Sequence, residues 1–331
     1  MSDFKKYPLL FEPVYVEIMW GGNLMKKVLD REVPATGKPI GEAWDIVDRE
    51  NAESIVENGV YCGMSIRELL NLYGEEIVGK GYDSSVRFPL LFKIIDAGKR
   101  LSLQVHPDSV TASLYDGAEE KTEMWYILAA ENDAEIFAGL KSSCTKRLFL
   151  EQIYSKEIEN CLQKYKSFSG DAYYISAGRV HAIGAGNLIL EIQQNSNTTY
   201  RLSDWGRVDS EGNSRELHVD QALNCINFAD RSTPRITALC TSGKRNMKAP
   251  IVSMCPYFKV DDIKLCEPYM DFTNGKSFHV LSAIDSSISL EIEKEAIVIP
   301  RGRSCMVPAC AGQYTMTPME NKVATVLRTT L

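Results

Sequence analysis

The sequence predicts a mainly β fold with two β-sandwich domains and a few added helices. Most of the chain consists of short apolar or alternating runs interrupted by Gly, Pro, Asn or Asp, a pattern typical of antiparallel sandwiches and barrels. Its 331 residues exceed the size at which one hydrophobic core usually stops growing. A polar, basic stretch over residues 234–250 separates two strand-rich regions, so we expect domains at residues 1–245 and 246–331.

The predicted strands of the first domain follow one another from residue 88 onward. An apolar run over residues 88–98 ends in a turn, and an alternating apolar and polar run follows over residues 101–106. The later runs share the same short length and the same kinds of turn residue at their ends. They cover residues 123–129, 134–137, 172–175, 188–194 and 198–202.

Helical periodicity is confined to three regions. Residues 65–77 repeat apolar side chains at helical spacing, with Ser65 at the N-cap position and Glu68 completing a capping box. Residues 145–166 are expected to form one or two helices, and residues 219–225 a short one. The helices are therefore additions to a β framework.

The second domain again consists of strand-like runs. Residues 297–302 resemble residues 174–178 in placing a turn after an apolar strand, which suggests a weak repeat of one β-fold. The second copy has no His or Glu at the corresponding positions, so any metal chemistry is expected in the first domain. The strands predicted here cover residues 257–263, 277–283, 288–292, 296–299 and 304–307.

The composition excludes several classes of protein. A net charge of -7 argues against a general affinity for nucleic acid or for acidic membrane surfaces. The nine cysteines are odd in number and form no C-x-x-C pair, as expected for free thiols in a reducing compartment. Charged residues interrupt residues 1–20, and no apolar run is long enough to span a membrane. We therefore expect a cytoplasmic protein.

A set of polar side chains on the predicted strands suggests a metal site. Gln104 and His106 lie two residues apart in an alternating run, so on a strand both point to the same face. An amide oxygen and an imidazole nitrogen each offer a lone pair without carrying charge. Glu123 and His181 lie on two further strand-like segments. The four residues together indicate a metalloenzyme.

Each of these residues also has a structural interpretation. A lone histidine on a strand is more often a hydrogen-bonded core or surface residue than a ligand. Glu123 would then form a surface ion pair with Lys121, and the amide of Gln104 is in any case a weak ligand. Residues that fit no ligand pattern, and to which we assign structural roles, are His218, His279, Trp20, Trp44 and Trp125.

Several motifs together resemble those of the type I phosphomannose isomerases, in their short bacterial form. The matching blocks are residues 18–22, 41–46, 88–108, 121–127 and 175–207. The resemblance implies cupin-type jelly-roll domains and a zinc-dependent interconversion of mannose 6-phosphate and fructose 6-phosphate. It implies as zinc ligands Gln104, His106, Glu123 and His181. The chain departs from the family pattern at residues 97–100 and at Met124, both outside that ligand set.

The resemblance also implies roles for residues around the metal. Ser102 and Lys121 would line the sugar-phosphate pocket, and Lys121 with Arg207 would hold the phosphate. Arg201 would be catalytic, because its guanidinium stays protonated and stabilises negative charge. By the same resemblance Glu191 would face this pocket, and it is a candidate for proton transfer. Lys121 and a water molecule at the metal remain alternative bases.

Two other functions fit parts of the same pattern. One is a different metal-dependent cupin enzyme, such as an iron dioxygenase, although Gln104, Lys121 and Arg201 suit a phosphosugar better. The other is a non-catalytic protein that binds sugar phosphates. The expected partner is a phosphorylated hexose, with neither nucleic acid nor membrane involved, and both a monomer and a homodimer are compatible with the sequence.

Overall fold

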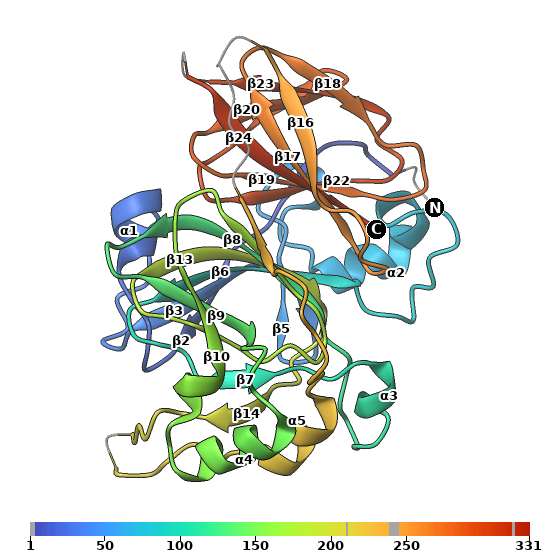
Figure 1. Cartoon of the computed structure of the whole chain (residues 1–331). Coiled ribbons are helices and arrows are strands. Elements are labelled where there is room, and N and C mark those ends of the chain that lie inside the picture. The colour runs from blue at the N-terminus through green and yellow to red at the C-terminus, as the bar shows by residue number, and fades with distance from the viewer. Residues whose placement is uncertain (1–3, 210, 238–244, 320–321) are drawn as a thin grey trace. The chain divides into compact units, whose positions relative to one another are not determined.

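The computed structural model describes residues 4–209, 211–237, 245–319 and 322–331, and its regular structure is mostly antiparallel β-sheet (Figure 1). The prediction of a mainly β fold is thus confirmed. The strands predicted from the apolar runs are present, with ends that differ by a few residues. Several strands without a clear apolar run complete the sheets.

The chain forms two compact units that are not continuous in sequence. One contains residues 1–14, 44–93 and 239–331, and the other contains residues 15–43 and 94–238. The sequence suggested a linear division into residues 1–245 and 246–331, whereas here N-terminal segments join the C-terminal region. The reason is strand pairing: β1 (Leu9–Leu10) extends a C-terminal sheet by pairing with β22 (Ser304–Val307).

Two sheets carry most of the strands between residues 14 and 236. The order in the larger is β15-β11-β8-β13-β6-β3-β2, and in the smaller β10-β9-β12-β7-β14. The larger consists of β15 (Arg235–Ile236), β11 (Ala172–Ile175), β8 (Glu123–Ala130), β13 (Asn187–Gln194), β6 (Leu90–Ala97), β3 (Ile40–Ile46) and β2 (Val14–Glu17). The smaller consists of β10 (Leu162–Lys166), β9 (Glu135–Leu140), β12 (His181–Ile183), β7 (Leu103–Val105) and β14 (Tyr200–Ser203).

These two sheets face each other across an apolar core. Trp125 and Tyr173 from the larger sheet pack in one buried cluster with Ile136 and Ile183 from the smaller. The opposite face of the smaller sheet packs against helices α4 (Lys146–Tyr154) and α5 (Val219–Cys225), which lie beside β7 and β14 in Figure 1. The smaller sheet is therefore covered on both faces.

Helices form in the three predicted regions and also in regions where none was predicted. Helix α2 (Ile66–Ile77) begins with the predicted capping box of Ser65 and Glu68. The prediction of helix over residues 145–166 is wrong at its end, because β10 follows α4 there. Gln163 and Tyr165 lie on one side of β10 and the exposed Lys164 and Lys166 on the other, an alternation typical of a strand. The remaining short helices are α1 (Leu24–Leu29), α3 (Ser109–Ala112), η1 (Gly59–Tyr61) and η2 (Ile158–Cys161).

The C-terminal region forms a second pair of sheets around its own apolar core. The six-stranded sheet runs β1-β22-β19-β24-β17-β16 and the four-stranded sheet β18-β23-β20-β21. Their remaining strands are β16 (Met247–Val252), β17 (Lys259–Leu265), β18 (Tyr269–Phe272), β19 (His279–Ala283), β20 (Ile288–Ile292), β21 (Glu295–Ile299), β23 (Gln313–Pro318) and β24 (Ala324–Thr330). A separate hairpin pairs β4 (Asp48–Arg49) with β5 (Ala52–Glu53).

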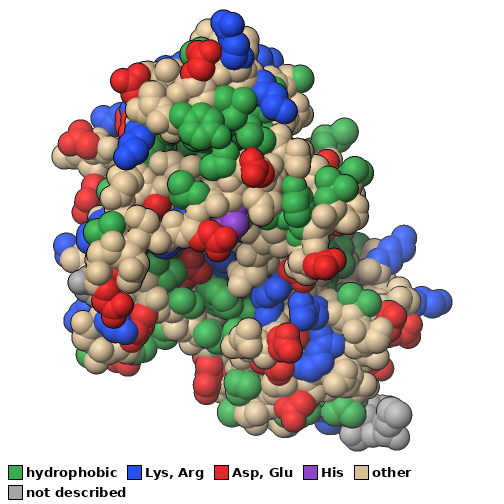
Figure 2. All heavy atoms as spheres, turned by 90° about the horizontal axis from the view of Figure 1, so that it is seen from below, with side chains coloured by type: hydrophobic (Ala, Val, Ile, Leu, Met, Phe, Trp, Pro, Cys, Tyr) green, Lys and Arg blue, Asp and Glu red, His purple; other side chains and the backbone are tan. Residues whose placement is uncertain are grey.

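The surface and the thiols fit an ordinary globular protein. On the face shown in Figure 2, acidic and basic side chains are interspersed instead of gathering by sign. The eight cysteines within the described residues are free thiols. Within the same residues, every helix is too short or too polar to cross a bilayer.

One buried carboxylate supports the start of α1. The backbone N–H of Met25 donates to Asp96 Oδ2 at 2.7 Å, and Asp96 is fully buried on β6. Burial raises the pKa of Asp96 to about 6, against the lowering effect of the hydrogen bonds from the α1 backbone. The folded protein therefore holds a proton on this residue more tightly than the unfolded chain does.

We predict that this proton makes stability depend on pH. The stabilisation is complete below pH 4, the region of the unfolded pKa, and is lost as the pH rises through about 6. Asp96→Asn keeps an oxygen acceptor for Met25 but cannot ionise. From pH 4 to pH 7, the free energy of unfolding of the wild type should fall by about 2–3 kcal/mol more than that of the variant. Urea titrations of both proteins at the two pH values measure this difference. Parallel pH profiles of the two proteins would contradict this assignment.

Candidate metal centre

Strand register brings the predicted ligand candidates onto facing surfaces of the two sheets. Gln104 on β7 lies directly opposite His181 on β12 and, on its other side, opposite Arg201 on β14. Directly opposed residues of antiparallel strands point to the same face, so these three side chains form a row across the smaller sheet. Glu123 begins β8 in the larger sheet, opposite Gln193 on β13.

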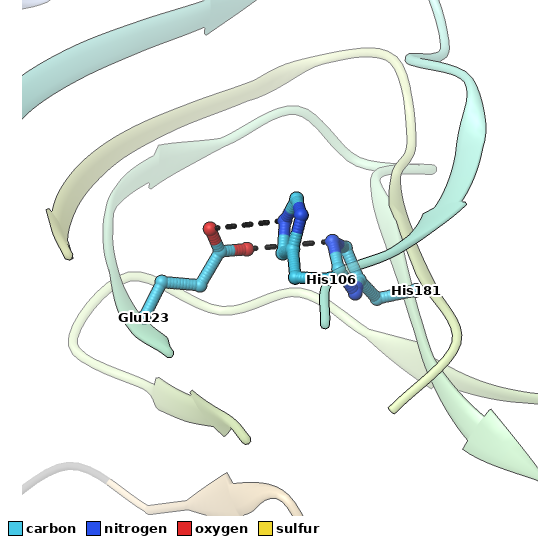
Figure 3. A group of neighbouring side chains, drawn as sticks. All are labelled: His106, Glu123 and His181. Carbon is cyan, nitrogen blue, oxygen red and sulfur yellow. Dashed lines mark ion pairs between the residues drawn. The ribbon is translucent and has the colours of Figure 1, made fainter. Parts of the chain in front are cut away.

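His106, Glu123 and His181 meet in a buried cluster (Figure 3). Their candidate ligand atoms all lie within 4.8 Å of one another, and each side chain is at most 1% exposed. One carboxylate oxygen of Glu123 is 3.4 Å from His106 Nε2, and the other is 3.4 Å from His181 Nε2. Three donors on three different segments thus point at one small volume, as a shared cation requires.

The hydrogen bonds of both histidines set their tautomers. His106 Nδ1 lies 2.9 Å from the carbonyl oxygen of Thr198, and His181 Nδ1 lies 2.8 Å from that of Arg179. A carbonyl oxygen only accepts, so each Nδ1 carries the proton and donates it. Each Nε2 is then left with its lone pair facing Glu123. Second hydrogen bonds of this kind orient histidine ligands in metal sites.

The charges of the cluster suit a divalent cation. Burial lowers the pKa of His106 and lowers that of His181 to about 3, so both imidazoles are neutral. Burial alone would raise the pKa of Glu123, but the ammonium of Lys121 holds it well below its ordinary value. Lys121 Nζ lies 2.8 Å from Glu123 Oε2. Neutral imidazoles and an ionised carboxylate are the forms that bind metals.

Gln104 stands beside His181 and offers a fourth donor. Its amide nitrogen Nε2 lies 3.2 Å from His181 Nε2, where it donates to the ring nitrogen. A half-turn of the amide exchanges its nitrogen and oxygen and presents the lone pairs of Oε1 to the cluster. The amide N–H then faces the hydroxyl of Ser102, which lies 3.4 Å from the present position of Oε1.

Unsatisfied polar atoms support the interpretation of this cluster as a metal site. His106 Nε2 and Glu123 Oε1 are buried and accept no hydrogen bond from the residues that the structure describes. Leaving such atoms without a partner costs free energy, and a cation between them would satisfy both. The residues present therefore fit a metal ion with nitrogen and oxygen ligands.

Glu191 and Lys121 lie close to this cluster. Glu191 on β13 is two residues from Gln193, the strand partner of Glu123, so the two carboxylates share one face of the larger sheet. Its Oε1 accepts a hydrogen bond from Trp125 Nε1 at 2.9 Å. Burial lowers the pKa of Lys121, but the charges of Glu123 and, to a smaller extent, Glu191 raise it above its ordinary value.

Arg201 and Arg207 belong to a group of cations further along the row. Arg201 donates from Nη1 to the carbonyl oxygen of Glu216 at 2.8 Å, while its Nε is buried without a hydrogen-bond partner among the described residues. Arg207 and Arg215 both form ion pairs with Asp204. Burial lowers the pKa of Arg201, and the neighbouring Arg215 lowers it further.

Sequence reasoning missed several residues of this region. Arg215 lies in a polar loop where nothing in the local pattern distinguishes it from a solvated cation. Thr198 and Arg179 act through backbone carbonyls, which side-chain motifs cannot reveal. Trp125 was assigned to the core, and only the register of β8 against β13 places its indole N–H beside Glu191.

A separate pocket of about 540 Å³ lies on the other side of the smaller sheet. Tyr115, Thr198, Tyr200 and Gln221 are among its lining residues. Tyr200 precedes Arg201 on β14, so the two side chains point to opposite faces. The pocket therefore does not contain the row formed by His181, Gln104 and Arg201.

Comparisons with known proteins agree with these observations. A family model described as the catalytic domain of type I phosphomannose isomerase matches residues 9–139, and one described as the cupin domain of mannose-6-phosphate isomerase matches residues 248–326. The mannose-6-phosphate isomerase ManA of Bacillus subtilis is 33% identical over 310 residues, covering 93% of this chain and 95% of the relative. The mannose-6-phosphate isomerase of Streptococcus mutans is 35% identical over 253 residues, covering 76% and 77% of the two chains.

Solved structures extend the similarity to the fold. The crystal structure of the mannose 6-phosphate isomerase from Bacillus subtilis matches 99% of this chain and 100% of that chain, with a TM-score of 0.86 at 31% identity. A putative mannosephosphate isomerase from Archaeoglobus fulgidus matches 99% of both chains with a TM-score of 0.75. Its 19% identity shows the shared fold alone.

We predict that the buried cluster binds a metal ion and that each histidine is needed for it. His181→Ala removes one of the donors, so the purified variant should lose the tightly held ion that elemental analysis detects in the wild type. His279→Ala is the control, because His279 is also buried but pairs with Tyr314 in the C-terminal sheets. Equal metal content in both variants and the wild type would contradict the assignment of this cluster as the metal site.

Proposed function

Because the chain belongs to the type I phosphomannose isomerase family, we propose that it interconverts mannose 6-phosphate and fructose 6-phosphate with the help of zinc. The observation that carries this proposal is the buried cluster of His106, Glu123 and His181. Its neighbours add what an isomerase requires, namely a further carboxylate at Glu191 on the larger sheet, and arginines on β14 of the smaller sheet and in the chain that follows it.

Four residues would hold the zinc ion: Gln104, His106, Glu123 and His181. They supply two imidazoles, one amide oxygen and one carboxylate, so the site keeps a net positive charge with a divalent ion. When bound, zinc polarises a sugar oxygen and stabilises the negative charge that develops on it. The hydrogen bonds from His106 to Thr198 and from His181 to Arg179 hold the two rings in the orientation for binding.

We assign proton transfer to Glu191. Isomerisation removes the proton from C2 of the open-chain aldose while the oxygen at C1 gains a proton, which gives an enediol. Return of a proton to C1 and loss of the proton on the C2 oxygen then give the ketose. Glu191 can accept and return the carbon-bound proton, whereas the ammonium of Lys121 is already paired with Glu123 at 2.8 Å. Lys121 then serves as a fixed positive charge beside the reacting oxygens.

The arginines suit the phosphate end of the substrate. Neighbouring strands lie about 4.8 Å apart, so the row from His181 through Gln104 to Arg201 spans roughly 10 Å. An open-chain hexose phosphate has a similar length between its carbonyl and its phosphorus. We assign the phosphate to Arg201 and Arg207, although the guanidinium of Arg207 is paired with Asp204 here, and Ser102 adds a hydroxyl beside Gln104.

A coupled assay with mannose 6-phosphate tests the proposed function directly. We expect the purified protein to produce fructose 6-phosphate, to lose this activity on removal of metal with a chelator, and to regain it with zinc. Oxygen uptake is measured in parallel, because a dioxygenase would consume oxygen. Binding of mannose 6-phosphate without turnover would instead identify a non-catalytic sugar-phosphate protein and refute the proposal.

We predict that Arg201 contributes to the rate and not to metal binding. Arg201→Ala should keep its zinc but lower kcat/KM by roughly 10²–10³, because a charge aimed at the substrate is removed. Arg147→Ala is the matched control, since that side chain is 90% exposed on α4. Zinc is measured together with the kinetics. A variant that loses both zinc and activity would show that Arg201 supports the fold of the metal site instead.

A further inference from the structure

Trp125 occupies the centre of a buried row on the larger sheet. It lies opposite Glu191 on β13 and opposite Tyr173 on β11, so the three side chains share one face. Trp125 is 1% exposed, Glu191 4% and Tyr173 0%. The indole N–H of Trp125 donates to Glu191 Oε1 at 2.9 Å. A core residue thus reaches directly to the carboxylate to which we assign proton transfer.

The same indole also touches the metal cluster. Its ring meets the imidazole of His181 edge to face, with centroids 5.3 Å apart and an angle of 74° between the planes. Trp125 therefore contacts both a candidate metal ligand and the candidate base. Its ring is held in turn by the apolar cluster that contains Ile127, Tyr173 and Ile189.

An indole is well suited to fix a carboxylate that exchanges protons. Its N–H only donates, so it can neither take the proton from Glu191 nor compete for it. A tryptophan side chain has two rotatable bonds, and dense packing restricts both. A hydrogen bond to an ionised carboxylate is also stronger than one between neutral groups. One oxygen of Glu191 is consequently held by a donor anchored in the core.

We propose that Trp125 is a positioning residue that acts through Glu191, in addition to its place in the core. The inference rests on the proposed function, because it presumes that Glu191 transfers a proton during isomerisation. Trp125 holds Oε1 in place, which orients the carboxylate toward the substrate carbon. The contact with His181 keeps this carboxylate at a constant distance from the metal ligands.

Trp125→Phe keeps an aromatic ring but removes the N–H, and Tyr173→Phe is its control. Tyr173 belongs to the same row, and its hydroxyl is buried without a hydrogen-bond partner among the described residues. We expect Trp125→Phe to lower kcat roughly ten- to hundredfold, the loss of one charged hydrogen bond, with KM nearly unchanged. Tyr173→Phe should keep the wild-type kcat. Equal kcat values for all three proteins would overturn the inference.

A double-mutant cycle separates positioning from a general effect on the fold. If Trp125 acts through Glu191, adding Trp125→Phe to Glu191→Gln should lower kcat by less than about twofold. The inference would be overturned if Trp125→Phe lowered kcat by the same factor in the wild type and in Glu191→Gln. Loss of zinc from Trp125→Phe would overturn it as well. These outcomes leave the proposed function intact, whereas a wild-type protein without turnover of mannose 6-phosphate would refute both.

An isosteric replacement covers the case in which Trp125→Phe does not fold. Benzothienylalanine at position 125 replaces the indole N–H by sulfur and preserves the shape of the ring. We expect this protein to keep its zinc and its thermal stability while kcat falls as in Trp125→Phe. A wild-type kcat in this protein would show that the hydrogen bond to Glu191 plays no part in the rate.

Discussion

This site depends on the pairing of one ionised carboxylate, that of Glu123, which is shielded from water. Glu123 is fully buried, and leaving its charge unpaired would cost several kcal/mol. Lys121 neutralises it from one side, and two neutral imidazoles direct lone pairs toward it from the other. A cation among these lone pairs would satisfy the ones that have no hydrogen-bond partner within the described residues. Metal binding at this cluster would therefore be coupled, through Glu123, to the two sheets that carry the donors.

Antiparallel register is what converts distant parts of the sequence into this arrangement. Gln104, His181 and Arg201 come from three separate segments, yet they are direct neighbours across β12, β7 and β14. A shift of one residue in either pairing would turn the corresponding side chain to the opposite face. The apolar residues between them prevent such a shift, because they fill the cores on both sides of the sheet. The core thus determines which polar residues meet.

Much of this could be anticipated from the sequence, because the strands and the alternation of Gln104 with His106 are local patterns. The capping box at Ser65 and the helix over residues 219–225 are local in the same sense. The strand over residues 162–166 was not recognised, since its alternation involves long polar side chains and it depends on pairing with β9. The contact of Trp125 with Glu191 depends on long-range register, which a single sequence does not encode visibly. The role of Arg215 as a partner of Asp204 depends on a loop conformation and was equally hidden.

The pairing of β1 with β22 links the first residues of the chain to some of the last. During synthesis on the ribosome, Leu9 and Leu10 emerge long before Cys305 and Met306, and their final hydrogen bonds have to wait for those residues. Until then this strand presents bare edge groups, the kind of surface that chaperones recognise and that leads to aggregation. A gene truncated near residue 245 would leave that edge permanently open. Synthesis of the chain through β22 is thus a condition for folding the compact unit that contains both strands.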